Sequence, residues 1–329
     1  DEKDRAEDCR KLLLPHRESL GDGEGARILG RILVSEGDYR GGASLLQAYS
    51  APRLPLYHEA DKKLQSVYKS ASDAALSKLN QNRGPAEFYR KYEKAGTDEQ
   101  DRLVQDFIAA EVKKSVAFVT AQERLAETSR VVPVMLDLGI AGLNLARDEP
   151  DAAKRQAGLA AAEKAFLSIE GSAGETKEYQ LFLGQVYYWM GKHMEGKALF
   201  DKLLGQASST EVALVVSESL RQVGEREEAR RIAEAAWKKG QDAAQRSSAA
   251  KARAVLWKDT DDRILWLERC EVRSQELEID LQEARAQKLI DDGKRNEAIP
   301  LLRSAAASYD KLPRSAGTLN NSANMLSTL

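Results

Sequence analysis

The residues of this chain that could do chemistry are few and widely spaced. Asp259, Asp261 and Asp262 are close enough in sequence to suggest a calcium loop, in which carboxylates coordinate the ion. Such a loop also needs a central glycine and a distal glutamate, which this segment does not have. Because the aspartates precede a predicted helix, we expect them to cap it and to stabilise its amino-terminal dipole.

A glycine-dense stretch, Gly21–Gly25, is the other segment that could hold a ligand. A phosphate cradle is the functional interpretation, but Asp22 and Glu24 would repel an anion, and no Gly-Lys-Ser/Thr sequence follows. We therefore interpret the stretch as a hinge and helix start. The sequence contains no dinucleotide fingerprint, nucleophile elbow or kinase signature, so it offers no catalytic residue and no cofactor site. We predict that the chain is not an enzyme.

Cysteines and histidines follow no ligand spacing. Cys9 and Cys270 lie far apart, and the three histidines are scattered, so we predict two reduced thiols and no metal site. Reduced thiols favour the cytoplasm. The chain begins with Asp1 rather than Met, so we expect a piece of a longer protein, and an extracytoplasmic location stays open.

Composition and hydropathy argue against nucleic-acid binding and against a membrane span. Charged residues make up 31% of the chain but cancel to a net charge of -2, so no uniform field would attract nucleic acid. The sequence has no run of about 18 apolar residues, so we predict no membrane span. Aromatic residues are only 6%, and Ala, Leu, Glu, Arg and Lys dominate, which is typical of a mostly helical chain.

A helical repeat is the clearest pattern that could position side chains. Leu183-Gly184-x-x-Tyr187 is followed by Gly191, Gly196 and Phe200, which predicts two antiparallel helices over 178–204. The same order of small and large residues recurs at 25–50. Two more helix pairs are indicated by the glycine-containing turns at 222–226 and 292–295.

These segments resemble tetratricopeptide repeats, helix pairs of about 34 residues with the pattern W-x2-L-G-x2-Y, A-x3-F and P. The matches cover residues 23–55, 177–240 and 279–313, and they are degenerate because Gln180 replaces the tryptophan and Gly196 the alanine. The resemblance implies an all-α fold, namely an α-solenoid of antiparallel helix pairs with a right-handed superhelix. It also implies binding of proteins or peptides.

We predict four segments along the chain. Residues 1–55 form an amino-terminal repeat-like unit with a leading helix, and 56–130 form an irregular long-helix segment. Residues 131–313 form the repeat array, which includes a helix pair without the repeat signature at about 241–278. Residues 314–329 are the first helix of a further repeat, so we expect more repeats to follow in the natural protein.

Two finer expectations concern helix boundaries. Residues 98–127 are expected to form one long helix, because their apolar positions keep a mostly continuous inward face. Gly139 and Phe166 indicate one more repeat unit, whose connection is lengthened through Arg155 and Gln156. In total we expect roughly 14 to 17 helices.

The resemblance also implies which residues face a partner, because the first helix of each tetratricopeptide unit lines a concave groove. Phe182, Tyr188 and Trp189 would hold an apolar or aromatic side chain of a peptide. Three asparagines would pair with the peptide backbone, as in kinesin light chain-like repeats. The candidate residues are Phe182, Gln185, Tyr188, Trp189, Arg221, Asn320, Asn321, Asn324, Arg27 and Arg31. The alternatives are packing of the aromatic rings on a neighbouring helix and ordinary exposure of the asparagines.

Charge differs between the two ends of this predicted groove. Arg27 and Arg31 make the amino-terminal part basic, whereas Asp280, Glu283 and Asp291 make the carboxy-terminal part acidic, which favours a polarised ligand. Some tetratricopeptide domains hold a chaperone's terminal carboxylate with a lysine and an asparagine. That pair is missing at the corresponding positions here.

The leading hypothesis is therefore a non-catalytic scaffold that binds a protein or peptide partner in its groove. The alternative is a regulatory or sensor segment of a larger protease or kinase whose catalytic part lies outside this chain. A weaker third hypothesis, by analogy with lytic transglycosylases that contain helical superhelices, is an enzyme in its own right. No motif in the sequence supports it.

Overall fold

A computed structural model describes residues 2–206, 209–309 and 311 of the chain. The chain divides into two compact units, Asp1–Tyr179 and Gln180–Leu329. The described residues form 18 α-helices and one 3-10 helix, with no strand among them. This is more than the roughly 14 to 17 helices expected. One reason is that the single helix expected at 98–127 is two helices, and another is that a four-residue helix, α10, was not expected.

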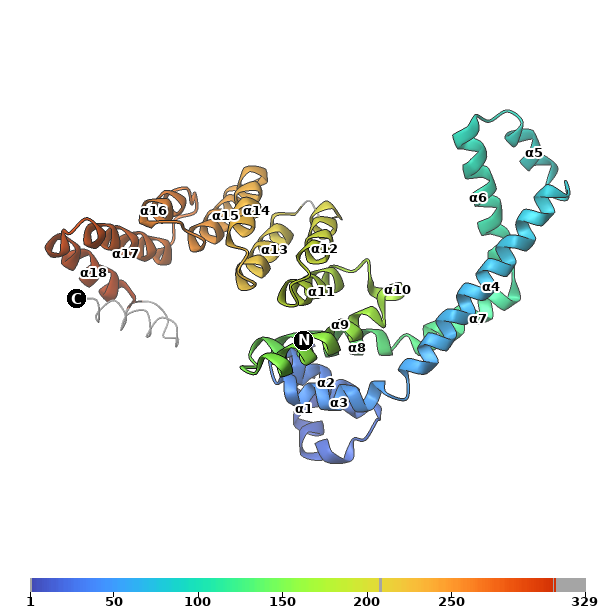
Figure 1. The fold of residues 1–329 in the computed structure, drawn as a ribbon, viewed down its shortest axis with the longest axis horizontal. Helices are drawn as coiled ribbons and strands as arrows, with labels where there is room; N and C mark the ends of the chain where they lie inside the picture. Colours follow the sequence, from blue (N-terminus) through green and yellow to red (C-terminus); the bar gives the residue numbers. More distant parts are fainter. Residues whose placement is uncertain (1, 207–208, 310, 312–329) are drawn as a thin grey trace. The chain divides into compact units, whose positions relative to one another are not determined.

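Eleven helical elements build the first unit, which contains the N-terminal part of the chain (Figure 1). They are α1 (Glu2–Leu13), η1 (Leu14–Ser19), α2 (Glu24–Ser35), α3 (Tyr39–Ser50), α4 (Leu54–Asn80), α5 (Ala86–Tyr92), α6 (Thr97–Lys113), α7 (Val116–Thr128), α8 (Val131–Arg147), α9 (Ala152–Leu167) and α10 (Glu170–Ala173).

Eight helices follow, the first of which contains the boundary between the units. They are α11 (Lys177–Trp189), α12 (His193–Gln206), α13 (Thr210–Gln222), α14 (Arg226–Lys239), α15 (Ala243–Val255), α16 (Thr260–Glu268), α17 (Gln275–Asp291) and α18 (Arg295–Tyr309).

The predicted glycine turns are present in four helix pairs. In each, a glycine with φ between 77° and 91° follows the first helix, a conformation that side chains rarely adopt. The next residue donates its backbone N–H to a carbonyl near the helix end, as Lys192 does to Tyr187 at 2.8 Å, which is the Schellman motif. The four glycines are Gly37, Gly191, Gly224 and Gly293.

Close helix contacts at other glycines define how the pairs pack. A Cβ atom at Gly184 would lie 2.5 Å from Phe200 Cε1, and one at Gly139 would lie 2.6 Å from Phe166 Cε2. Only a residue without a side chain permits this approach. Consecutive helices pack as pairs, including α2 with α3, α8 with α9, α13 with α14 and α17 with α18. The fold is all-α, an α-solenoid of antiparallel helix pairs, as predicted.

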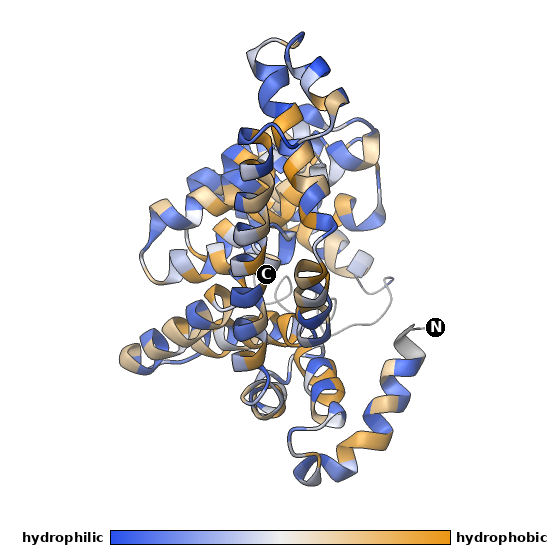
Figure 2. Ribbon diagram, turned by 90° about the vertical axis from the view of Figure 1, so that its right-hand side faces the viewer, coloured by the Kyte–Doolittle hydropathy of each residue, from blue (hydrophilic) through white to orange (hydrophobic). Residues whose placement is uncertain are grey.

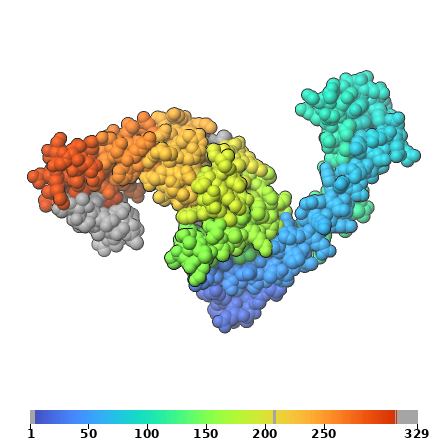
Figure 3. Space-filling view, viewed as in Figure 1, coloured from blue at the N-terminus to red at the C-terminus, as the bar shows by residue number. Residues whose placement is uncertain are grey.

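The first unit departs from a simple array because α3 packs directly on α8. The intervening helices, α4 to α7, form a separate arm in which α6 and α7 both lie against α4 (Figures 1 and 3). The pair α2–α3 therefore stacks on the pair α8–α9, although 80 residues separate Ser50 from Val131. The sequence pattern indicates an irregular segment at 56–130, but not that the helix pairs on either side of it pack on each other.

Two expectations about helix boundaries were wrong. The expected single helix at 98–127 is divided into α6 and α7, because Ser115 begins a new helix by accepting a hydrogen bond from Phe118 N at 3.4 Å. Arg155 and Gln156 are not part of a connection. They lie inside α9, which begins at Ala152 with Asp151 as its cap.

Helix α8 supplies much of the core of the first unit, including the buried residues Val131, Val134 and Met135. Figure 2 shows hydrophobic and hydrophilic segments side by side on the same helices. No single helix in the described part of the chain is long and apolar enough to cross a membrane. Taken together, α7 and α8 meet the same length and composition criteria, with a bend of 42° between them.

Candidate functional site

Tyr188, a predicted groove residue, lies in the core of the second unit. Its side chain is 8% exposed and stacks on Phe200, with ring centroids 5.4 Å apart and planes 20° apart. A Cβ atom at Gly196 would lie 2.6 Å from Tyr188 Cδ2, so this glycine makes room for the ring. Tyr188 therefore fills the contact between α11 and α12. Its neighbours Phe182 and Trp189 are half-buried.

The polar residues of the same region are paired with other side chains of the protein. Gln185 is buried and donates Nε2–H to Ser219 Oγ at 2.9 Å, which ties α11 to α13. Arg221 donates to both oxygens of Glu218, at 2.7 Å and 2.6 Å. This hydrogen bonding lowers the pKa of Glu218. Gln185 and Arg221 thus already have partners within the fold.

Arg27 and Arg31 lie in the first unit, on α2. Arg27 donates Nε–H to Glu24 Oε2 at 2.7 Å, and Arg31 donates Nε–H to Asp137 Oδ2 on α8 at 2.6 Å. Burial raises the pKa of Asp137, and the hydrogen bond from Arg31 opposes that shift. The three predicted asparagines, Asn320, Asn321 and Asn324, lie outside the described residues.

Another surface of the second unit has the features of a binding site. Trp257, in the connection between α15 and α16, is 40% exposed, and it lines two hollows of about 520 Å3 and 560 Å3. We call these two hollows, with Trp257 between them, the Trp257 surface. The residues of the first hollow that matter for its chemistry are Lys251, Val255, Arg263, Leu267, Glu276 and Asp280.

The first hollow contains two carboxylates without partners among the residues that the structure describes. Asp280 is half-buried, Glu276 is exposed, and neither forms a hydrogen bond or ion pair with any residue that the structure describes. Burial raises the pKa of Asp280, and the nearby cations Arg263 and Lys251 only partly oppose it. Arg263 is itself engaged by Glu283, with Nη2 and Oε2 3.2 Å apart.

In the second hollow the acidic groups are satisfied. Asp259 caps α16 by accepting from Asp262 N at 2.8 Å, which confirms the predicted capping role. Asp261 pairs with Lys288 at 2.8 Å, and Asp291 accepts from Thr260 Oγ1 at 2.6 Å. Within the described residues, no group of three or more His, Cys, Asp or Glu side chains is arranged to hold a metal ion. Cys9 and Cys270 are free thiols, as predicted.

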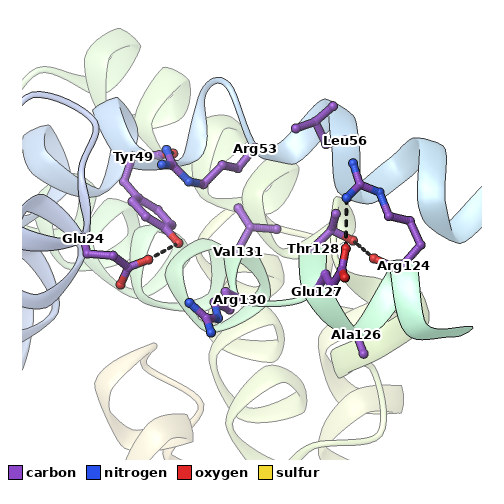
Figure 4. A pocket seen from close by; sticks show the side chains of 10 residues that line it. All are labelled: Glu24, Tyr49, Arg53, Leu56, Arg124, Ala126, Glu127, Thr128, Arg130 and Val131. Atoms are coloured by element: carbon purple, nitrogen blue, oxygen red, sulfur yellow. Dashed lines mark hydrogen bonds and ion pairs between the residues drawn. The ribbon is translucent and has the colours of Figure 1, made fainter.

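A third hollow, of about 470 Å3, lies in the first unit where the arm joins the helix pairs (Figure 4). Tyr49 donates its hydroxyl to Glu24 Oε1 at 3.1 Å, and the Arg53 guanidinium lies 4.1 Å from the centre of the Tyr49 ring. Arg124 donates to Glu127 Oε2 at 3.0 Å. Four of the five charged side chains that line this hollow therefore already interact with another lining residue.

Comparisons with known proteins do not assign this chain to a family. No protein-family model matches this sequence, and a comparison with curated proteins finds no match. Among solved structures, a crystal structure of yeast Tom70 is similar over 99% of this chain and 93% of that chain, with 13% identity and a TM-score of 0.36. A similarity at this level carries no argument about function, so the site is described from its own geometry.

Sequence reasoning did not select Trp257 or pair it with Asp280. It placed Trp257 in a helix pair without the repeat signature, and it noted Asp280 only as part of an acidic end. One indication was available. In the stretch Trp257-Lys258-Asp259, a large aromatic residue stands two residues before a helix cap. No repeat glycine is present there to bring a partner helix close enough to cover the ring.

Proposed function

We propose that this chain is a non-catalytic scaffold of the tetratricopeptide type that binds a protein or peptide partner. The Trp257 surface is the observation that carries the proposal. It places an exposed indole between two hollows and next to a carboxylate that has no partner among the described residues. An aromatic anchor beside pockets and charged groups is the usual arrangement of an interaction hot spot.

The helix pairs that surround this surface support the proposal. Trp266 and Leu267 of α16 are buried with Leu277 and Leu281 of α17 in one hydrophobic cluster, so the helices that line the hollows are fixed by a core. A surface that is already ordered loses little conformational entropy when it binds a ligand. Such a scaffold can therefore hold a flexible peptide with few contacts.

Phe182 and Trp189 on α11 remain proposed partner contacts apart from the Trp257 surface, because both are half-buried and each retains some exposed area. Tyr188 is not included, since its ring is buried against Phe200. Gln185 is also not included, because its amide already donates to Ser219.

Selection of peptides from a random library displayed on phage, with the 329-residue chain as target, tests the proposal. Peptides that are selected should shift the NMR resonance of the Trp257 indole N–H, which is assigned by its loss in Trp257→Phe. Trp257→Ala should abolish this binding, while Val215→Ala, on the exposed face of α13, should leave it unchanged. Failure to select any peptide, or selected peptides that bind Trp257→Ala equally well, would refute the proposed function at this surface.

A further inference from the structure

We infer that the Trp257 surface recognises a peptide segment in which a lysine or arginine stands next to an apolar residue. The cation would bind at Asp280 and Glu276, and the apolar side chain would lie against Trp257 and Val255. This inference rests on the proposed function and adds to it the chemistry of the partner.

Asp280 is the residue from which the inference starts. A half-buried carboxylate without a hydrogen-bond donor among the described residues is unfavourable, because it has lost part of its hydration and gained no donor in exchange. Two other acidic groups nearby do have partners: Asp262 accepts two hydrogen bonds from Arg253, and Glu283 pairs with Arg263. The fold therefore gives Asp280 no stabilising role, whereas a cation from a ligand would supply the missing partner.

Glu276 adds a second carboxylate to the same hollow. It lies four residues before Asp280 on α17, so the two side chains are neighbours on one face of the helix. Both line the hollow of about 520 Å3, and Glu276 also lacks a partner among the described residues. An ammonium or guanidinium group between them would form two charge-assisted hydrogen bonds.

The Trp257 surface as a whole carries more negative than positive charge. Its two hollows are lined by five acidic side chains and three basic ones. Lys288 is neutralised by Asp261, and Arg263 by Glu283. Lys251 is the cation of this surface that has no ion pair with a described residue. The field in the hollows therefore favours a positively charged ligand.

Apolar area beside these carboxylates explains why the peptide should also have an apolar residue next to its cation. Val255 is 58% exposed and Trp257 is 40% exposed, and both line the hollow that contains Asp280. An indole face attracts a cation and also covers the methylene groups of a lysine or arginine. A neighbouring apolar residue of the peptide would cover Val255, which would otherwise stay in water.

Matched peptides test the inference directly. A peptide selected for binding to the full chain is resynthesised in four forms, with Lys, Arg, Gln or Glu at the position next to its apolar residue. Affinity is measured by fluorescence anisotropy. We expect the Lys and Arg forms to bind about tenfold or more tightly than the Gln form, and the Glu form to bind most weakly. Asp280→Asn should remove most of the preference for Lys over Gln.

Two further variants separate recognition from loss of folding. Lys251→Gln removes the competing cation of the hollow, so it should strengthen binding of the Lys peptide by about two- to threefold at low salt. A damaged fold would not produce tighter binding. The control is Asp201→Asn on α12, where Asp201 pairs with Lys197. It changes the charge by the same amount as Asp280→Asn does, and it should leave the affinity for the peptide unchanged.

The outcomes distinguish this inference from the proposed function. If the Gln or Glu form binds as well as the Lys form and still shifts the Trp257 indole resonance, the surface binds peptides but the cationic preference is refuted. An unchanged preference in Asp280→Asn would also refute it. If no selected peptide of any form binds, both the inference and the proposed function are refuted.

Discussion

The α11–α13 region and the Trp257 surface lie in the same unit, and they differ in what their aromatic and charged side chains do. In the first region, Tyr188 is buried against Phe200, and Gln185 is bound to Ser219. At the Trp257 surface, the aromatic ring is exposed and Asp280 has no partner among the described residues.

The difference follows from how closely the helices approach. In the pair α11–α12, Gly184 and Gly196 bring the helices so near that the large side chains between them have no route to solvent. The pair α15–α16 has no such glycine within its helices, and Trp257 lies beyond the end of α15. Residues that carry the repeat signature are thus used for packing, and side chains outside the signature are available for a partner.

The largest expected effect concerns the two aromatic residues themselves. Tyr188→Ala removes a ring that is 8% exposed and should lower the free energy of unfolding by about 3 kcal/mol. Trp257→Ala removes a ring that is 40% exposed and should lower it by less than about 1 kcal/mol, yet abolish peptide binding. Urea denaturation followed by circular dichroism measures the change in stability of both variants. Equal losses of stability would show that Trp257 is also a core residue.

A second, smaller effect tests the role of the glycine contacts. Gly184→Ala places a methyl group 2.5 Å from Phe200 Cε1, which should cost about 1–3 kcal/mol of stability because the ring or the helix must move. The matched control is Gly205→Ala on α12, whose Cβ would meet no described atom within 4 Å beyond its own helix. That change should instead stabilise the protein by about 0.5–1 kcal/mol. Equal effects of the two changes would contradict the packing argument.

The smallest expected effect is a pH dependence that compares two aspartates. Burial raises the pKa of Asp280, so the folded state binds this proton more tightly than the unfolded state does. Its ionisation therefore costs stability, and the cost grows as the pH rises from about 4, the unfolded value, through the raised folded value. Asp280→Asn should be at least as stable as the parent protein at pH 7, and the difference should shrink toward pH 4.

Asp262 should behave in the opposite way. Burial opposes its ionisation, but hydrogen bonds from Arg253 and from Lys258 N outweigh it and lower its pKa. Its contribution to stability is present above the unfolded pKa and is lost as the pH falls through the lowered folded value. Asp262→Asn should therefore be less stable than the parent at pH 7. Denaturant unfolding from pH 3 to pH 8 checks both variants, and the same sign for both would contradict the assigned environments.

The helix pairs could be predicted because they depend on local sequence. Gly191, Gly224 and Gly293 have a backbone conformation that other residues avoid, and each lies in the turn where it was expected. The capping role of Asp259 is equally local, because its side chain accepts from a backbone N–H three residues away. The break between α6 and α7 was also a local event, but a single serine cap was too weak a signal to outweigh a continuous apolar pattern.

The candidate site could be predicted only in part. Tyr188 and Gln185 were expected to face a partner, yet Gln185 is covered by Ser219, which is 34 residues away, and Tyr188 lies beside Gly196 on the next helix. The contact between α3 and α8 spans an inserted arm of four helices, and no periodic pattern marks it. These features depend on which segments meet in space, and the repeat pattern describes only neighbouring segments.

The sequence by itself determined the helical class, the pairing of neighbouring helices and the glycine turns, since backbone preference and amphipathic period act over a few residues. Only the tertiary structure decided which side chains remain available. The exposure of Trp257, and the lack of a partner for Asp280 in the described part of the chain, are properties of the space between α15, α16 and α17. That space depends on how closely the helices pack, which no single segment specifies.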